Sequence, residues 1–346
     1  MIPWIIRHPR YIGTFGKMVR SFRECETARR VFAGNGTVVP PVMILSITSS
    51  CNLRCPGCLA VAAGNIRQSH ATHAIREPDL THDQWRSIIL QGNRLGVFCY
   101  TVAGGEPFMY PRFINLIEEF DNRLFVVFTN GTTIKETAYT RLKRMANAVI
   151  VFSVEGSERA TDDRRGRQVF ERAMKAMNRM NDQGILTGVS VNINRANVHE
   201  WMASYFLNDI IHMGVRLVFL IELIPTQQPL SGEEIFLNES ILTPEERAAF
   251  RAKVLEYKKT KPVFLLHSPG DEERLGGCVS AGRGFAHVTP SGDVTPCPVS
   301  NVATHNLTNA TLEDAFKSAF SVKYERMNIF WKPRECPVPS LLTRKK

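Results

Sequence analysis

The amino-acid sequence predicts an α/β protein, a partial (β/α)6 TIM-like barrel followed by a small C-terminal α+β domain. From residue 42 onward, six short runs rich in β-branched and aromatic residues alternate with longer segments whose apolar residues have helical spacing. Cysteines and polar residues follow the carboxyl ends of these runs. In a parallel barrel the loops at these strand ends carry the functional residues. Periodicity alone does not separate such a barrel from an open doubly wound sheet.

The predicted strands are short and bounded by polar or glycine-containing segments. They are Val42–Ser49, Val97–Val102, Leu124–Thr129, Val149–Val154, Thr187–Asn192 and Arg216–Glu222. Two capping boxes mark helix starts, Thr81 with Gln84 and Thr243 with Glu246. We expect the second of these helices to end the barrel. The predicted domains are a basic N-terminal helical arm (1–38), a core barrel (39–235) and a C-terminal domain (236–346).

Positive charge is concentrated near the N-terminus. The chain has 43 Lys and Arg against 33 Asp and Glu, a net charge of +10, and about half of this excess lies in residues 1–30. Such an excess favours an anionic partner. Because Trp4 and Phe15 are among the apolar residues that interleave with the arginines, this segment is either a peripheral membrane contact or a helix packed on the barrel. Gly13 and Gly16 weaken a continuous amphipathic helix and favour the packed one. No apolar run approaches the roughly 20 residues of a membrane span.

Three of the eight cysteines lie together. Cys51, Cys55 and Cys58 have the spacing C-x3-C-x2-C and follow the first predicted strand directly. Three thiolates in a tight loop can bind three irons of a [4Fe–4S] cubane and leave the fourth iron open. The alternative is a structural zinc site, but such sites use four ligands in paired spacings, and no fourth Cys or His lies in this loop. A site of reduced thiols indicates a cytoplasmic, oxygen-poor compartment.

The cysteine loop resembles the cluster motif of the radical S-adenosylmethionine (SAM) superfamily. Gly104-Gly105-Glu106-Pro107, after the second strand, resembles the GGEP segment that binds the methionine amino group of SAM. Two glycines allow the backbone close to a ligand, and a carboxylate accepts hydrogen bonds from an ammonium group. The sequence departs from many relatives at Gly57, where they carry an aromatic residue before the third cysteine. The residue that contacts adenine is therefore unassigned.

Further segments after the third and fourth strands resemble the same superfamily. Asn130 lies in Thr-Asn-Gly, and Ser153 and Glu155 lie in Ser-Val-Glu-Gly, whose polar residues face the ribose hydroxyls in relatives. Arg165 lies in a D-x-x-R-G stretch, where the resemblance puts the arginine near the methionine carboxylate. The resemblance thus implies SAM contacts at Gly104, Gly105, Glu106, Pro107, Asn130, Ser153, Glu155 and Arg165.

The C-terminal third contains a second group of cysteines. Cys278, Gly292 and Cys297 have the spacing C-x13-G-x4-C, which resembles the opening of SPASM and Twitch auxiliary-cluster domains. Only Cys336 follows, so at most one auxiliary iron–sulfur cluster fits, and these cysteines could instead be merely buried. The fourth ligand is open among a substrate atom, His287, an acidic side chain such as Asp271, or none. We interpret Cys25 and Cys99 as structural, His70 and His73 as solvated, and the polar loop 59–80 as a possible lid.

The resemblance implies an enzyme that cleaves SAM reductively on a [4Fe–4S] cluster. The resulting 5′-deoxyadenosyl radical would abstract a hydrogen from a peptide or small metabolite, with a flavodoxin or ferredoxin as reductant and no nucleic acid as partner. The absence of a G-x-x-x-x-G-K-[ST] loop disfavours NTP hydrolysis. The alternatives are a non-catalytic zinc or iron–sulfur binding module, and a membrane-associated protein that acts through its basic arm.

Overall fold

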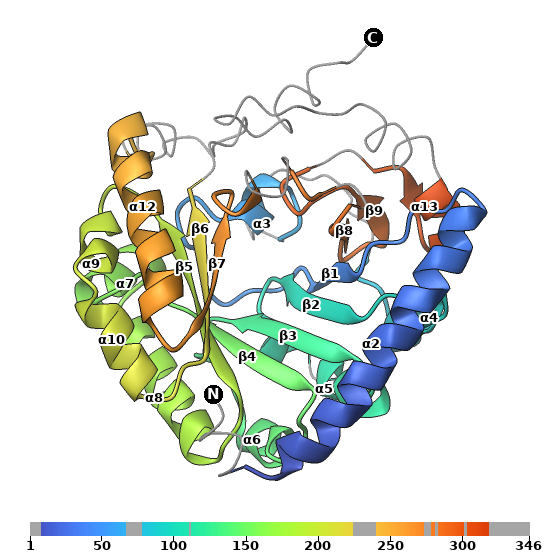
Figure 1. The fold of residues 1–346 in the computed structure, drawn as a ribbon, viewed down its shortest axis with the longest axis horizontal. Coiled ribbons are helices and arrows are strands. Elements are labelled where there is room, and N and C mark those ends of the chain that lie inside the picture. The colour runs from blue at the N-terminus through green and yellow to red at the C-terminus, as the bar shows by residue number, and fades with distance from the viewer. Residues whose placement is uncertain are drawn as a thin grey trace.

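A curved parallel sheet with helices on its outer side forms the body of the protein (Figure 1). The computed structural model describes residues 8–66, 78–110, 112–223, 240–272, 278–280, 283–300 and 303–317. Within these ranges ten strands form one sheet, in the order β10-β9-β8-β1-β2-β3-β4-β5-β6-β7. They span Val42–Thr48 (β1), Cys99–Gly104 (β2), Leu124–Thr129 (β3), Ala148–Ser153 (β4), Thr187–Ile193 (β5), Leu217–Glu222 (β6), Phe264–Ser268 (β7), Phe285–Val288 (β8), Asp293–Thr295 (β9) and His305–Asn306 (β10).

Neighbouring strands from β1 to β7 run parallel, and β8 joins the other edge of β1, also in parallel. The last two strands, β9 and β10, run antiparallel to their neighbours. The predicted α/β fold with a partial parallel barrel is therefore confirmed.

The helices span Arg10–Gly34 (α2), Leu59–Ala62 (α3), His82–Leu95 (α4), Phe113–Glu119 (α5), Glu136–Leu142 (α6), Glu158–Arg165 (α7), Val169–Asp182 (α8), Val198–Met202 (α9), Tyr205–His212 (α10), Pro244–Thr260 (α12) and Leu312–Lys317 (α13), with a 3₁₀ turn at Pro107–Met109 (η1).

All six predicted strands are present, with boundaries that differ by at most two residues and with β3 as predicted. The largest shift is in β2, which begins at Cys99 and not at Val97. The reason is that the Val97 N–H bonds to the Gly92 carbonyl (2.9 Å) and so belongs to the end of α4, which Gly96 closes in the left-handed conformation. Both predicted capping boxes are observed. The helix after the second box, α12, does not end the barrel, because β7 follows it and pairs in parallel with β6.

The two faces of the sheet bury different clusters. On the outer face, Met43 and Leu45 of β1 are fully buried in the large cluster that includes Trp85 of α4. On the inner face, Val151 of β4 belongs to a smaller apolar cluster, against which Phe219 of β6 packs. Side chains alternate between faces along a strand, so this division identifies which polar residues point into the barrel.

The basic N-terminal helix α2 lies across the amino-terminal ends of the strands (Figure 1). The Tyr11 hydroxyl donates to the Gly184 carbonyl (3.2 Å) just before β5, and the Ser21 hydroxyl donates to the Asn122 carbonyl (2.7 Å) just before β3. The helix is continuous through its glycines and is packed on the barrel. Among the described helices, none has both the length and the apolarity required to span a membrane.

Candidate active site

The three clustered cysteines form a loop that leaves the carboxyl end of β1. Asn52 fastens this loop to the turn after β3: its Nδ2 donates to the Thr132 hydroxyl (2.8 Å), and its Oδ1 accepts from Asn130 Nδ2 (2.9 Å). Sequence reasoning gave Asn52 no role, because its partners lie in another βα unit. These bonds connect the cysteine loop to Asn130, one of the predicted SAM contacts.

The thiols of the loop are half-buried and poorly solvated. Burial raises the pKa of Cys51 to about 11, and burial also raises the pKa of Cys55 although the Arg165 and Arg164 guanidinium groups oppose it. The metal-free Cys51 and Cys55 thiols are therefore protonated near neutral pH, and iron binding to them must release protons. Within the described ranges, no three His, Cys, Asp or Glu side chains converge closely enough to hold a single metal ion. The thiols of a cubane each bind a different iron and need not converge on one point.

The Gly-Gly-Glu-Pro segment lies directly against the end of β1. The Gly105 N–H donates to the Thr48 carbonyl (2.8 Å), and the Glu106 N–H donates to the Ser50 carbonyl (2.8 Å). A Cβ on Gly105 would lie 2.0 Å from the Ser50 oxygen, and Gly104 has φ +107°. Only glycines fit this approach, so the segment and the cysteine loop have a fixed relative position.

The Glu106 carboxylate is buried and already accepts three hydrogen bonds. They come from the Thr129 hydroxyl (2.7 Å), the Asn130 N–H (2.7 Å) and the Phe108 N–H (3.1 Å). Burial raises the pKa of Glu106, although these bonds oppose the shift. Glu106 thus holds the turn after β3 as well as occupying the predicted ligand position in the GGEP segment.

Glu155, just after β4, is held by two arginines at the end of α7. Its carboxylate accepts from Arg165 Nε (2.8 Å), from the Arg164 guanidinium and from the Asn192 N–H (3.0 Å), and its side chain is 1% exposed. Burial alone would raise the pKa of Glu155, but Arg164 and Arg165 outweigh it and hold that pKa below its usual range. Arg164 also reaches the Gly57 carbonyl (3.4 Å) in the cysteine loop.

The charges of this cluster suit an anionic group. Two guanidinium groups face one carboxylate, which leaves one positive charge beside Cys55. A thiolate-bound cluster and a methionine carboxylate are both anionic, so the donor set and its surroundings fit the implied cofactors. Arg165, which the resemblance puts near the methionine carboxylate, is oriented here by Glu155.

The inner face of β5 supplies an acceptor that the sequence did not reveal. Asn192 lies on the same face as Leu186, which packs against the inner cluster. Asn192 Oδ1 is buried and has no hydrogen-bond donor among the described residues. Ser153 ends β4 and pairs with Ser190 of β5 in the register of the two strands. A ligand hydroxyl or amine at this end of the barrel would satisfy the Asn192 oxygen.

The second group of cysteines is only partly described. Cys278 is half-buried, with its Sγ 3.0 Å from the Ser280 hydroxyl, and Cys297 is buried just after β9. Burial raises the pKa of Glu272, which shares a hydrogen bond with Cys278 and which sequence reasoning overlooked. Cys336 lies outside the described residues, as do His70, His73 and half of the possible lid, residues 67–77.

The two side chains named as possible fourth ligands have other partners. Asp271 accepts the His267 N–H (2.9 Å) and bonds to Lys258. His287 is fully buried, and both of its ring nitrogens are hydrogen-bonded within the protein. Of the two cysteines interpreted as structural, Cys25 is buried on the barrel side of α2, and Cys99 packs against the inner cluster, where burial raises its pKa to about 12.

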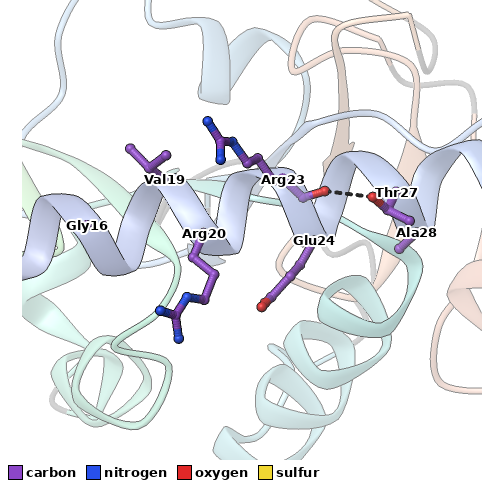
Figure 2. A pocket seen from close by; sticks show the side chains of 7 residues that line it. All are labelled: Gly16, Val19, Arg20, Arg23, Glu24, Thr27 and Ala28. Atoms are coloured by element: carbon purple, nitrogen blue, oxygen red, sulfur yellow. Dashed lines mark hydrogen bonds between the residues drawn. The ribbon is translucent and has the colours of Figure 1, made fainter.

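A hollow of about 690 Å³ lies elsewhere, along α2 (Figure 2). It is lined by residues of that helix only: Gly16, Val19, Arg20, Arg23, Glu24, Thr27 and Ala28. Because α2 crosses the amino-terminal ends of the strands, this hollow is separate from the cysteine loop, which lies at the carboxyl end of β1. It belongs to the basic surface and not to the candidate active site.

Comparison with known proteins identifies the family to which this part of the chain is related. Residues 45–206 match the family model of the Radical SAM superfamily, a stretch that includes the cysteine loop, the GGEP segment and the Glu155 cluster. Residues 45–206 therefore form a radical SAM domain, the kind of domain that uses SAM and a [4Fe–4S] cluster as cofactors.

Three curated relatives and one solved structure illustrate the similarity. The chain is 27% identical to the Fe-coproporphyrin III synthase of Methanosarcina barkeri over 171 residues, 48% of this chain but only 40% of that protein. It is 26% identical to the mycofactocin maturase MftC of Mycobacterium tuberculosis over 311 residues, 87% of this chain and 74% of MftC. It is 24% identical to the PqqA peptide cyclase of Streptomyces rochei, covering 82% and 74%. The fold resembles Streptococcus suis SuiB bound to S-adenosylmethionine, with TM-score 0.69, 14% identity and 89% and 75% coverage.

Proposed function

We propose that this chain cleaves SAM reductively on a [4Fe–4S] cluster held by Cys51, Cys55 and Cys58, and that it thereby abstracts hydrogen from a peptide. The observation that carries the proposal is the position of the cysteine loop, at the carboxyl end of β1, beside the GGEP backbone after β2 and beside the arginines that hold Glu155 after β4. When bound, the reduced cluster supplies the electron that splits SAM into methionine and a 5′-deoxyadenosyl radical, which removes a hydrogen atom from the substrate. A flavodoxin or ferredoxin is the proposed electron donor.

The chain's own residues orient the reactants. The GGEP backbone has a fixed position against β1 and presents carbonyls to an ammonium group. The positive charge that Glu155 leaves uncompensated orients a carboxylate, and the unpartnered Asn192 oxygen accepts from a hydroxyl. The apolar inner cluster keeps water from the base of the barrel.

Production of 5′-deoxyadenosine tests the proposed chemistry. Anaerobically reconstituted protein with dithionite should form it from SAM, and Cys55→Ala should abolish it. Cys25→Ala is a matched control, because that cysteine is a buried residue of α2, away from the loop. Undiminished turnover by Cys55→Ala would refute the assignment of the cluster to this loop. Zinc without iron in the purified protein would refute the proposal as a whole.

A peptide is the proposed substrate class because relatives that match most of this chain are named as a maturase and a peptide cyclase. Hydrogen abstraction transfers the substrate's hydrogen to 5′-deoxyadenosine, so its origin can be traced. An extract from cells grown in D₂O contains deuterated substrate, so the enzyme should form deuterium-labelled 5′-deoxyadenosine when this extract is added. Protease treatment of the extract should abolish the labelling, because it destroys a peptide substrate. Transfer that survives proteolysis would assign a small metabolite instead.

We also propose that Cys278, Cys297 and Cys336 hold a second cluster, as their spacing indicates. A [4Fe–4S] cubane contributes about four irons, so the wild type should carry about eight per chain and the triple cysteine-to-alanine variant about four. The first cluster should remain in that variant. Equal iron content in the two proteins would contradict a second cluster.

The outer face of α2 supports peripheral contact with an anionic membrane. Ile12 and Phe15 are exposed there, Phe15 to 67%, and Arg20 and Arg23 line the adjacent hollow. Co-sedimentation with phosphatidylcholine vesicles should require added phosphatidylglycerol, weaken with salt, and fall in Phe15→Ser. Phe264→Ser is the matched control, since Phe264 is 58% exposed on β7. Binding that is indifferent to lipid charge, or equally impaired in both variants, would contradict this contact.

A further inference from the structure

A chain of buried hydrogen bonds connects the barrel wall to Cys297. The middle residue, His287 in β8, lies between β1 and β9, because β8 pairs with both strands. Its Nε2 is 2.8 Å from the Ser46 hydroxyl and its Nδ1 is 2.7 Å from the Thr295 hydroxyl. Thr295 Oγ1 in turn lies 3.1 Å from the Cys297 carbonyl. Ser46, His287 and Thr295 are all buried, His287 with 0% exposed.

The direction of each bond follows from the number of available protons. The Cys297 carbonyl can only accept, so the single proton of the Thr295 hydroxyl points to it. Thr295 must then accept from His287, which puts the ring proton on Nδ1. A neutral ring with this tautomer has a lone pair on Nε2, and Ser46 donates to it. Burial lowers the pKa of His287 to about 3, so the ring is neutral at pH 7.

We propose that His287 is a positioning residue that fixes the Cys297 loop on β8, the strand that pairs with β1. β1 leads into the cysteine loop, and the GGEP segment lies against its end. Because the backbone pairing joins β8 to β1, the bond from His287 to Thr295 gives the two cysteine sites a common reference, and the Ser46 hydroxyl sets the ring tautomer that this bond requires. The consequence for iron binding rests on the second cluster proposed above, whereas the placement of Cys297 does not.

Two substitutions at the same position separate this role from general destabilisation. In His287→Asn the side-chain amide reaches the place of Nδ1 and can still donate to Thr295, while Ser46 loses its partner. In His287→Gln the amide reaches the place of Nε2 and serves Ser46, while Thr295 loses its donor. Each variant loses one buried bond, but only the glutamine variant disconnects Cys297.

Alkylation of Cys297 in metal-free, reduced protein measures its placement without any cluster. Iodoacetamide labelling of Cys297, followed by peptide mass spectrometry, should be about tenfold faster in His287→Gln than in wild type and within about twofold of wild type in His287→Asn. Thr295→Val removes the hydroxyl that bonds to His287, so Cys297 should be labelled as fast in this variant as in His287→Gln. His267→Gln is the control, because His267 is another buried histidine, bonded to Glu222 (2.9 Å) beneath α12.

The reconstituted proteins then report the consequence for iron. His287→Gln should lose iron and absorbance from the second cluster while retaining 5′-deoxyadenosine formation, and His287→Asn should retain both. Equal labelling of Cys297 in the asparagine and glutamine variants would overturn the positioning role, as would unchanged labelling in Thr295→Val. If the triple cysteine variant and wild type carry equal iron, the second cluster is refuted, and the labelling result still decides the role of His287.

Discussion

Acidification should destabilise this protein through His287 in particular. An unfolded histidine has a pKa of about 6.5, whereas burial lowers the pKa of His287 to about 3. Between these values the unfolded chain binds a proton that the folded chain does not, so the free energy of unfolding falls as the pH drops below about 6.5. Integrated from pH 7.5 to pH 5, the loss from this one residue is about 2 kcal/mol.

Urea denaturation of the metal-free protein at pH 7.5 and pH 5 measures the effect. His287→Asn should be less stable than wild type at pH 7.5 but should lose about 2 kcal/mol less on acidification, because asparagine does not titrate. Glu155 and Glu222, whose pKa values are lowered in the fold, contribute stability that is lost only below about pH 4.5, and equally in both proteins. The same pH dependence in wild type and variant would refute the buried, neutral state of His287.

Three further substitutions test the geometry of the site. Gly105→Ala should reduce SAM binding at least tenfold in equilibrium dialysis, because its Cβ would lie 2.0 Å from the Ser50 oxygen. The control is Gly13→Ala on α2, whose Cβ would meet nothing within 4 Å. This substitution should leave the free energy of unfolding unchanged or raise it by up to about 1 kcal/mol. Asn52→Ala should release iron at least several-fold faster under a chelator while leaving thermal unfolding nearly unchanged, and an unaltered release rate would contradict its fastening role. Glu155→Gln leaves two arginines facing no carboxylate and should cost about 3 kcal/mol in thermal unfolding, a loss that a mere surface ion pair would not produce.

The elements with strong local signals were predictable from the sequence. The first six strands carry β-branched runs, and the capping boxes at Thr81 and Thr243 set two helix starts by local hydrogen bonds. The seventh strand was missed because Phe264–Ser268 lacks β-branched residues and follows a helix that resembled the end of the barrel. Its strand conformation is stabilised by pairing with β6, which a local pattern does not encode.

The candidate site was predictable only where a motif was contiguous. The cysteine loop and the GGEP segment are each read from a few consecutive residues. The role of Asn52 depends on residues 78 and 80 positions away, and the link from Ser46 to His287 spans 241 positions. Such contacts follow from the order of strands in the sheet. The unpartnered oxygen of Asn192 and the positioning of Cys297 could therefore be recognised only in the three-dimensional structure.

The position of α2 also affects how the chain is made. The helix leaves the ribosome before the barrel does, yet the Tyr11 hydroxyl bonds to a carbonyl 173 residues later. At about 5–20 residues per second, synthesis of that stretch takes roughly 10 to 35 seconds. Throughout this interval the start of the helix lacks its contact before β5, although Ser21 can bond to the Asn122 carbonyl once that segment has been made. The nascent chain therefore exposes an apolar and cationic segment during translation. Ribosome-associated chaperones have access to this segment until the loop before β5 emerges.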